Sequence, residues 1–493
     1  MNYCSPEKAG ISSEKVLEFF DRLDAKKLST HSVVMARGDE IFAECYYKPF
    51  DKDFKHRMYS VSKTFVSVAV GFCVQDGLIS LDDKMIKYFP EYVEDTPDKK
   101  ICSATIRDML KMESSVENEG VWWFGTGTKD RLECYFRVNG DKYPGTLFRY
   151  DSPGSYMLGV IVEKVTGKKF LKYLQEKVLD DIGFSKDAYC LEAPGGYSFG
   201  DSGVMCTTKD LLLFARFVLN KGTWKGKRYL NEEYLTEATT TSVANDVSAY
   251  GFELCNAHGY GYQIWGAPNG CFAMLGMGVQ VALCDPKHDF VFAINSDNQG
   301  NPLAYEPVFE ALYGSVIANL EDSPLPENEE ARKMLESSLA KKELFFLNGE
   351  KESDFSSEIN GKTFVCDPNR MGFKWLRFEF GESCGTLHYE NTQGVKAIKF
   401  GFGYNEFQKF PQENYSDMIA TYPEAGHMYD CACSADWQEE KKLRLRVQII
   451  DKYFGNLAMV FGFADADTLS ARFYKVAEAF LNEYEGLMNA KSV

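Results

Sequence analysis

The chain has 493 residues and a formal charge of −17, with 45% hydrophobic and 26% charged residues. This length exceeds one typical compact domain and predicts two, and the composition is that of a globular protein without an apolar run long enough to cross a bilayer. The acidic balance disfavours nucleic acid and acidic membrane surfaces as partners.

The first residues and the cysteines favour a cytoplasmic protein. The start of the chain lacks the basic and apolar regions of a secretory signal, so we expect a soluble, cytoplasmic chain. The 14 cysteines are scattered, which favours reduced thiols, and the one close pair, Cys431 and Cys433, fits alternate positions of a strand. Because metal-ligand spacing does not occur among Cys, His, Asp and Glu, we predict no metal or other cofactor.

The first predicted elements are a helix, a hairpin and a buried helix. Residues 11–25 carry an apolar stripe at helical spacing, and the strand-like segments 32–36 and 40–46 flank a tight turn. The segment that begins at Ser60 is apolar nearly all round, which is typical of a helix inside the core.

Ser60 and Lys63 lie three residues apart near the start of this buried helix, so their side chains would share one helical face. At a first turn the amide dipoles favour developing negative charge, and desolvation can hold a lysine neutral. This is the Ser-x-x-Lys arrangement of serine acyl-transfer enzymes. The same spacing occurs three more times, at Ser5/Lys8, Ser12/Lys15 and Ser338/Lys341. The spacing alone therefore leaves open an ordinary serine at the start of a core helix.

A long stretch in the middle of the chain has no regular pattern. Residues 113–149 show no clear period, and a loop of this length commonly lines a substrate cleft. We therefore expect Trp122 and Trp123 to add aromatic surface to substrate binding. Basic residues such as Arg131 and Arg137 could also reach the cleft.

Helices and late strands follow this stretch. Tyr150, Asp151 and Ser152 form a predicted loop before a helix over 156–165, and another helix is predicted over 211–219. Strand-like segments return at 260–265, 271–274, 280–284 and 290–295. With the two early strands, they predict one antiparallel sheet flanked by helices, an α+β arrangement.

A charged segment with prolines, residues 321–330, predicts a linker, and a helix is predicted after it over about 331–342. Beyond that point apolar residues alternate, which predicts an antiparallel β-barrel or sandwich with a helix over 476–487. The predicted organisation is a domain over 1–320, a linker and helix over 321–344, and a second domain over 345–493.

With these segments in order, residues 1 to about 318 resemble the β-lactamase-related serine hydrolases, the group of class C β-lactamases, DD-peptidases, esterases and D-aminopeptidases. The matching segments are 6–12, 59–65, 81–83, 88–91, 150–152, 202–210 and 259–265. The resemblance implies an antiparallel sheet flanked by helices plus a helical subdomain. The C-terminal part resembles the lipocalin-like barrels appended to some D-aminopeptidases, where the barrel shapes the cleft and forms dimer contacts.

The resemblance implies a role for each catalytic residue. Ser60 would attack a carbonyl carbon, Lys63 and Tyr150 would share the general-base and proton-shuttle work, and two backbone amides would hold the oxyanion. Ser152 falls on the last position of the family's Tyr-x-Asn or Tyr-x-Ser motif and would contact substrate, although a serine before a helix also commonly caps it.

The family's third motif, Lys-Thr-Gly or His-x-Gly, is altered in this chain. Its counterpart lies within residues 275–280, where Gly276, Met277 and Gly278 supply neither Lys nor His. In β-lactamases and DD-peptidases a lysine there binds a substrate carboxylate, so we predict a preference for neutral acyl substrates. The glycines would let a substrate lie against the strand, and Met277 would provide a flexible apolar contact.

The predicted function is that of a serine hydrolase that cleaves a small ester, an amide or a short peptide through an acyl-enzyme. Three alternatives stay open: a non-catalytic homologue that binds a ligand or partner, a D-amino-acid peptidase or amidase, and a β-lactamase. The appended barrel implies a homodimer as one assembly. His56 and His258 show no clear partner in the sequence, and we interpret both as structural.

Overall fold

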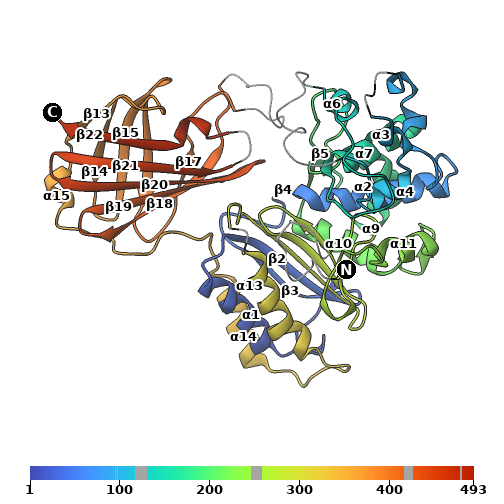
Figure 1. The fold of residues 1–493 in the computed structure, drawn as a ribbon. Helices are drawn as coiled ribbons and strands as arrows, with labels where there is room; N and C mark the ends of the chain where they lie inside the picture. The colour runs from blue at the N-terminus through green and yellow to red at the C-terminus, as the bar shows by residue number, and fades with distance from the viewer. Residues whose placement is uncertain are drawn as a thin grey trace. The chain divides into compact units, whose positions relative to one another are not determined.

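The computed structural model describes residues 1–94, 96, 98–116, 130–245, 258–301, 303–415, 426–477 and 480–493. Over these ranges the chain divides into two units, residues 1–343 and 344–493 (Figure 1). No helix in the same ranges is long and apolar enough to span a bilayer.

A mostly antiparallel sheet forms the centre of the first unit. In the described residues its seven strands run in the order β1-β3-β2-β12-β11-β10-β9, with β1 and β3 parallel. The strands are β1 (Asn2–Tyr3), β2 (Thr30–Arg37), β3 (Glu40–Tyr46), β9 (Trp265–Gly266), β10 (Phe272–Gly276), β11 (Gln280–Asp285) and β12 (Phe290–Ser296). Because β2 pairs with β12, the early and late strands meet inside one sheet, which confirms the predicted arrangement.

The strand predicted over 260–265 is wrong for most of its length. Trp265 belongs to β9, but the preceding residues turn sharply at Gln263, whose φ is 59°. This left-handed conformation cannot continue a strand, and the Gly261 amide closes the turn on the Ile264 carbonyl at 2.9 Å.

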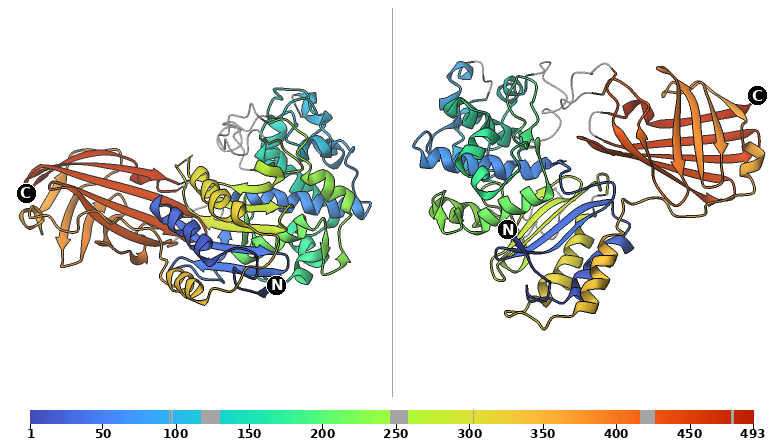
Figure 2. Two further views of the ribbon diagram at one scale, coloured as in Figure 1. Left: turned by 90° about the horizontal axis from the view of Figure 1, so that it is seen from below. Right: turned by 180° about the vertical axis from the view of Figure 1, so that it is seen from behind.

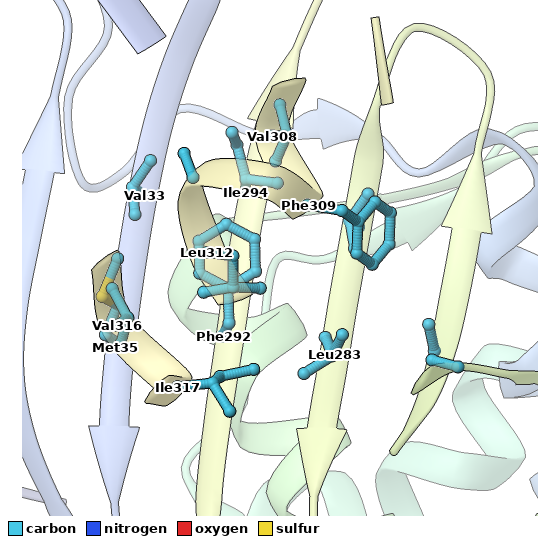
Figure 3. Packing of buried hydrophobic residues seen from close by; sticks show 14 of the residues in the cluster. Val33, Met35, Leu283, Phe292, Ile294, Val308, Phe309, Leu312, Val316 and Ile317 are labelled. Carbon is cyan, nitrogen blue, oxygen red and sulfur yellow. The ribbon is translucent and has the colours of Figure 1, made fainter. Parts of the chain in front are cut away.

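One face of the sheet is covered by helices from both ends of the unit (Figures 1 and 2). These are α1 (Ser13–Ala25) and α13 (Tyr305–Ala311), which continues through η6 (Leu312–Val316) and η7 (Ile317–Asn319). Figure 3 shows Val308, Phe309 and Leu312 packed over Leu283 and Phe292 of the sheet. Ser12 caps α1 by accepting a hydrogen bond from the Lys15 amide.

The segment predicted as a linker and helix belongs to the first unit. The helix α14 (Glu329–Leu339) packs against α1 and buries Ala331 and Leu335. Lys342, just beyond it, donates a hydrogen bond to Asp24 at the end of α1. The division of the chain therefore falls after this helix, at residue 343, because the apolar face of α14 is used within the first unit.

The opposite face of the sheet carries a helical region. There α10 (Thr208–Leu219) packs on β11 and β12, and α2 (Ser62–Gln75) packs on α7 (Ser152–Thr166). Every residue of α2 from Ser62 to Cys73 is buried, as a helix apolar on all sides predicts.

Two helix starts differ from the predictions. Ser60 lies in a 3₁₀ turn, η1 (Tyr59–Val61), which leads into α2. α7 begins at Ser152 rather than at residue 156, because Asp151 caps it and Pro153 suits a first helical turn.

The remaining described elements of the first unit are short. The helices and turns are η2 (Met85–Tyr88), η3 (Pro90–Tyr92), α3 (Lys99–Ser103), α4 (Ile106–Leu110), α6 (Arg131–Arg137), α8 (Phe170–Leu174), η4 (Gln175–Leu179), α9 (Asp180–Ile182), α11 (Glu232–Thr239) and η5 (Pro268–Gly270). The strands are β4 (His56–Arg57), β5 (Tyr189–Cys190), β6 (Val204–Cys206), β7 (Thr223–Trp224) and β8 (Lys227–Arg228).

The second unit is a closed barrel. Counted over its described residues, nine strands follow in the order β16-β15-β14-β13-β22-β21-β20-β19-β18, β16 closes on β18, and β17 adds to β18. The elements are α15 (Ser356–Ile359), β13 (Thr363–Cys366), β14 (Trp375–Phe380), β15 (Cys384–Asn391), β16 (Gly394–Gly401), β17 (Glu406–Lys409), β18 (Asp430–Glu439), β19 (Lys442–Ile450), β20 (Phe454–Asp465), β21 (Thr468–Val476), η8 (Asn482–Tyr484) and β22 (Gly486–Ser492). Alternate residues such as Leu443, Leu445 and Val447 are buried, as the period of two predicts.

The helix predicted over 476–487 is wrong in the described residues. Leu481 is left-handed with φ of 64°, which a helix does not accommodate, and β22 begins at Gly486. The last two residues of the predicted helix, Gly486 and Leu487, pair with β21 instead, and β22 also pairs with β13, which completes the barrel.

Candidate active site

Ser60 stands at the entrance to the buried helix α2, and its side chain is partly exposed. The residue before it, Tyr59, has φ of 46°, an uncommon conformation for a residue with a side chain. The Arg57 guanidinium lies 4.2 Å from the centre of the Tyr59 ring, and Gln299 donates to the Tyr59 hydroxyl at 3.2 Å. The surrounding contacts thus hold the turn that presents Ser60.

Lys63 contacts the hydroxyl of Ser60. Its Nζ lies 2.9 Å from Ser60 Oγ and 2.8 Å from the carbonyl oxygen of Asp201. Lys63 is 2% exposed, whereas at the other three Ser-x-x-Lys positions Lys8 and Lys341 are exposed and Lys15 is half exposed. Burial of the amine next to a serine therefore distinguishes this pair from the other three.

Tyr150 joins these two residues through its ring. The Lys63 Nζ lies 5.1 Å from the centre of the Tyr150 ring, a cation–π distance. On another side the ring stacks on Trp265 at 5.6 Å between centroids. The structure therefore brings Ser60, Lys63 and Tyr150 into one cluster, although Tyr150 is 87 positions beyond Lys63 in the chain.

Asp151 sets the backbone that carries Tyr150 and Ser152. Its carboxylate accepts a hydrogen bond from the Gly154 amide at 2.9 Å, which caps α7, and another from the Ser114 hydroxyl at 2.5 Å. Burial raises the pKa of this carboxyl to about 6, against the opposing effects of these hydrogen bonds and of nearby lysines. Ser152 is the first residue of α7 and is half-buried.

The end of β10 lies directly beside Ser60. A Cβ atom on Gly276 would clash with the Met58 carbonyl oxygen and lie 3.2 Å from the Ser60 amide nitrogen. Glycine is therefore required for this close approach. Met277 follows with 38% exposure, and Gly278 turns the chain with φ of 79°. The predicted segment thus lies at the nucleophile, and it carries no cationic side chain.

A buried carboxyl group lies behind Lys63. Asp201 is 1% exposed and its Oδ1 has no hydrogen-bond partner in the described structure. Burial raises the pKa of Asp201, and the positive charges of Lys63, Arg131 and Arg57 oppose that shift. The sequence analysis missed this residue, because nothing in the spacing between Asp201 and Lys63 indicates the contact.

Gln263 is a second residue that the sequence analysis missed. Its side chain accepts from the Ser155 hydroxyl at 2.6 Å and donates to the carbonyls of Met109 and Leu110 at 2.9 and 3.0 Å. Its own carbonyl accepts from Thr64 at 2.7 Å. One glutamine thereby joins α2, α4 and α7 behind the cluster. It falls within segment 259–265, so the resemblance could have drawn attention to it.

The two arginines that could reach the cleft lie in different places. Arg131 is 5% exposed, and its guanidinium lies 4.2 Å from the centre of the Phe199 ring. Arg137 forms an ion pair with Glu133 on the surface of α6. The charge of Arg131 lowers the pKa of the buried Asp201 carboxyl, whereas Arg137 faces solvent.

The predicted tryptophans, the two histidines and the question of a metal site remain. Trp122 and Trp123 lie outside the described residues. His56 is fully buried among aromatic rings, and burial lowers its pKa to about 3, while His258 is exposed. Among the residues that the structure describes, no group of three or more His, Cys, Asp and Glu could hold a metal ion.

Comparison with known proteins identifies a family that the first unit matches. The model of the family described as Beta-lactamase matches residues 18–313. A 6-aminohexanoate-dimer hydrolase of Paenarthrobacter ureafaciens is 27% identical over 279 residues, which cover 53% of this chain and 71% of the relative.

Two solved structures share the fold of the first unit. One is a Bacillus anthracis protein provisionally named a 6-aminohexanoate-dimer hydrolase, with TM-score 0.51 and 19% identity over 66% of this chain and 88% of that one. The other is a family VIII carboxylesterase, with TM-score 0.50 and 17% identity over 64% of this chain and 99% of that one. At these identities the likeness concerns the fold.

Proposed function

The chain belongs to the beta-lactamase family of serine hydrolases, and on that premise we propose that it cleaves a small ester or amide through an acyl-enzyme on Ser60. The observation that carries the proposal is the 2.9 Å distance between Ser60 Oγ and the buried Nζ of Lys63. A serine hydroxyl is a weak nucleophile, so it needs a basic group within hydrogen-bond distance.

Groups near Ser60 account for each step of the proposed reaction. Ser60 Oγ attacks the carbonyl carbon while its proton passes to the pair of Lys63 and Tyr150, and backbone amides hold the oxyanion. The same pair gives the proton to the leaving alkoxide or amine. Water then attacks the acyl-enzyme and gives a proton to the pair. The bond between the acyl carbon and Ser60 Oγ breaks, the pair returns the proton to Oγ, and the acid product leaves.

The segment beside Ser60 favours a neutral acyl group. An anion brought there loses hydration, and leaving it unpaired costs several kcal/mol. Gly276, Met277 and Gly278 offer no positive charge, and the half-exposed Met277 offers an apolar contact. Penicillin-like substrates and peptides with a free carboxylate are therefore expected to react more slowly than neutral esters and amides.

Covalent labelling tests the nucleophile. Wild type treated with a fluorophosphonate should gain one adduct by intact mass, and Ser60→Ala should not. Ser338→Ala is the matched control, because Ser338 has the same spacing to a lysine, and it should label like wild type. If wild type gains no adduct that Ser60→Ala lacks, the alternative of a non-catalytic homologue replaces this proposal.

A substrate panel tests the class. Neutral p-nitrophenyl esters and amino-acid amides, including D-amino-acid amides, should show higher kcat/KM than nitrocefin. They should also react faster than 6-aminohexanoate dimer, the substrate in the name of the relative, because that amide carries a free carboxylate. A clear preference for nitrocefin would favour a β-lactamase and overturn the proposed neutral acyl site.

A further inference from the structure

The turn between β10 and β11 has four consecutive carbonyl oxygens held by groups outside the reactive cluster. Tyr305 donates its hydroxyl to the Gly276 carbonyl, and Gln280 Nε2 donates to the Met277 carbonyl at 3.0 Å. The Ser296 hydroxyl lies 2.6 Å from the Gly278 carbonyl and 2.9 Å from the Val279 carbonyl. Side chains from α13, β11 and β12 thus orient this turn at every one of these peptide units.

Gln280 is built into the sheet beneath the turn. It is fully buried, and besides Met277 it donates to the Ser296 carbonyl at 2.5 Å. Its Oε1 accepts from Asn295 Nδ2 at 2.9 Å and from the Ser296 amide at 3.3 Å. Both donors and both lone pairs of this amide are used, so the side chain has one well-defined orientation.

The conformation of the turn explains why it needs support. Gly278 and Val279 both have left-handed backbones, with φ of 79° and 70°. For a β-branched residue such as Val279 this conformation is costly, so surrounding contacts must maintain it. The hydrogen bonds from Ser296 and Gln280 supply those contacts.

Holding a carbonyl also orients the neighbouring amide. In a trans peptide the C=O and the N–H point in opposite directions, so Tyr305 sets the direction of the Met277 amide and Gln280 that of the Gly278 amide. Gly276 lies against the Ser60 amide nitrogen, so these amides start next to the nucleophile.

We propose that Tyr305 and Gln280 are positioning residues for the reaction, which orient the peptide units after Gly276 so that an amide of this turn acts together with the Ser60 amide on the oxyanion. The inference rests on the proposed acyl-enzyme on Ser60. An oxyanion donor contributes when negative charge develops in the transition state, and removal of one such donor typically costs about 10²–10³-fold in kcat. A donor that stays in place but loses its orientation should cost less, about 10-fold to 100-fold.

Tyr305→Phe tests this proposal, because it removes one hydroxyl and adds no bulk. Tyr313→Phe is the matched control, since Tyr313 donates its hydroxyl to the Pro268 carbonyl at 3.1 Å, at the other end of β10. We measure kcat and KM on a neutral p-nitrophenyl ester and the inhibition constant of a boronic acid, whose tetrahedral adduct places an oxygen where the oxyanion forms. Tyr305→Phe should lower kcat and weaken boronate binding by about the same factor, with KM within about twofold of wild type, and Tyr313→Phe should change neither quantity.

A second variant guards against misfolding. Gln280→Met removes the hydrogen bond to the Met277 carbonyl and should also lower kcat and weaken boronate binding. If either variant shows no cooperative thermal transition, Ser296→Ala, which removes a single hydroxyl, takes its place. The proposal is overturned if folded Tyr305→Phe and Gln280→Met both keep wild-type kcat and boronate affinity. It is also overturned if Tyr313→Phe loses as much kcat and boronate affinity as Tyr305→Phe. The labelling experiment separates this inference from the proposed acyl-enzyme. If Ser60→Ala gains no adduct and Tyr305→Phe keeps wild-type kcat, the acyl-enzyme proposal stands and the positioning role of Tyr305 is rejected.

Discussion

Lys63 and Tyr150 carry the proton transfer of the proposed reaction, and their substitution gives the most direct prediction at the residue scale. Lys63→Ala and Tyr150→Phe should lower kcat by about 10²–10⁴-fold, the usual contribution of a positioned acid or base. KM should change much less, because neither group binds the acyl chain. Steady-state kinetics on a p-nitrophenyl ester measure both constants, with exposed Tyr143→Phe as the control. A variant with near-wild-type kcat would remove that residue from the mechanism.

Asp151 gives a prediction about pH. Burial raises the pKa of its carboxyl to about 6, above its ordinary value of 3.8, so between these values the folded protein keeps a proton that the unfolded chain has released. The free energy of unfolding therefore falls as pH rises through this window and stays lower above it. Asp151→Asn keeps the acceptor for Gly154 without a charge. It should remove this pH dependence and stabilise the protein above pH 6, by at most about 3 kcal/mol.

The measurement for Asp151 is the midpoint of urea unfolding at several pH values. The advantage of Asp151→Asn over wild type should be largest above about pH 7 and vanish near about pH 4. A difference between the two proteins that does not vary with pH would show that the Asp151 carboxyl ionises at an ordinary pKa.

Gly276 should tolerate no side chain. Gly276→Ala would place a Cβ against the Met58 carbonyl and near the Ser60 amide, so β10 must move away from the nucleophile. We expect kcat to fall by about 10²-fold, as for a lost oxyanion donor. Gly462→Ala is the control, because a Cβ there meets nothing within 4 Å and should leave kcat unchanged. Unaltered kcat in Gly276→Ala would separate the end of β10 from the chemistry.

At the scale of elements, Gln263 is the junction of three helices. Gln263→Ala would remove the hydrogen bonds that Gln263 makes to the Ser155 hydroxyl and the Met109 carbonyl. Each should cost about 0.5–1.5 kcal/mol, because Ser155 still donates to the Asp151 carbonyl and Met109 still accepts from the Met112 amide. We expect a clear loss of stability in thermal or urea unfolding. Gln75→Ala removes similar hydrogen bonds at an exposed site and should cost much less. Equal effects of the two variants would contradict the assigned role of Gln263.

At the scale of the molecule, each unit has its own buried core, so we predict that residues 1–343 and 344–493 fold independently. Ser60, Lys63, Tyr150 and Gly276 all belong to the first unit. A chain that ends at residue 343 should therefore keep its esterase activity within a few-fold and unfold cooperatively in calorimetry. Loss of activity in a folded fragment would instead assign the barrel a part in the site.

A second truncation tests where the boundary lies. A chain that ends at residue 320 removes α14 and exposes the face of α1 on which Leu335 packs. It should be less stable than the chain that ends at 343, because apolar burial contributes about 25 cal/mol per Å². Equal melting temperatures would favour the shorter domain that the linker composition predicts.

Features that depend on spacing along the chain could be predicted from the amino-acid sequence. Three residues of a helix suffice to bring Ser60 toward Lys63, and a period of two suffices to predict the strands of the barrel, because neighbours along the chain set these geometries. The order of the family segments along the chain was also enough to predict the fold of the first unit.

Contacts between groups that are far apart in the chain could not be predicted in this way, because they depend on how the whole unit packs. Four pairs share the Ser-x-x-Lys spacing, and what distinguishes Lys63 is its burial against Asp201 and Tyr150, which lie in a turn and a loop distant in sequence. The hydrogen bond from Tyr305 to the Gly276 carbonyl likewise joins residues that are distant in sequence. The same holds for the pairing of β22 with β13. Such contacts are selected by packing of the whole unit, and local periodicity carries no information about them.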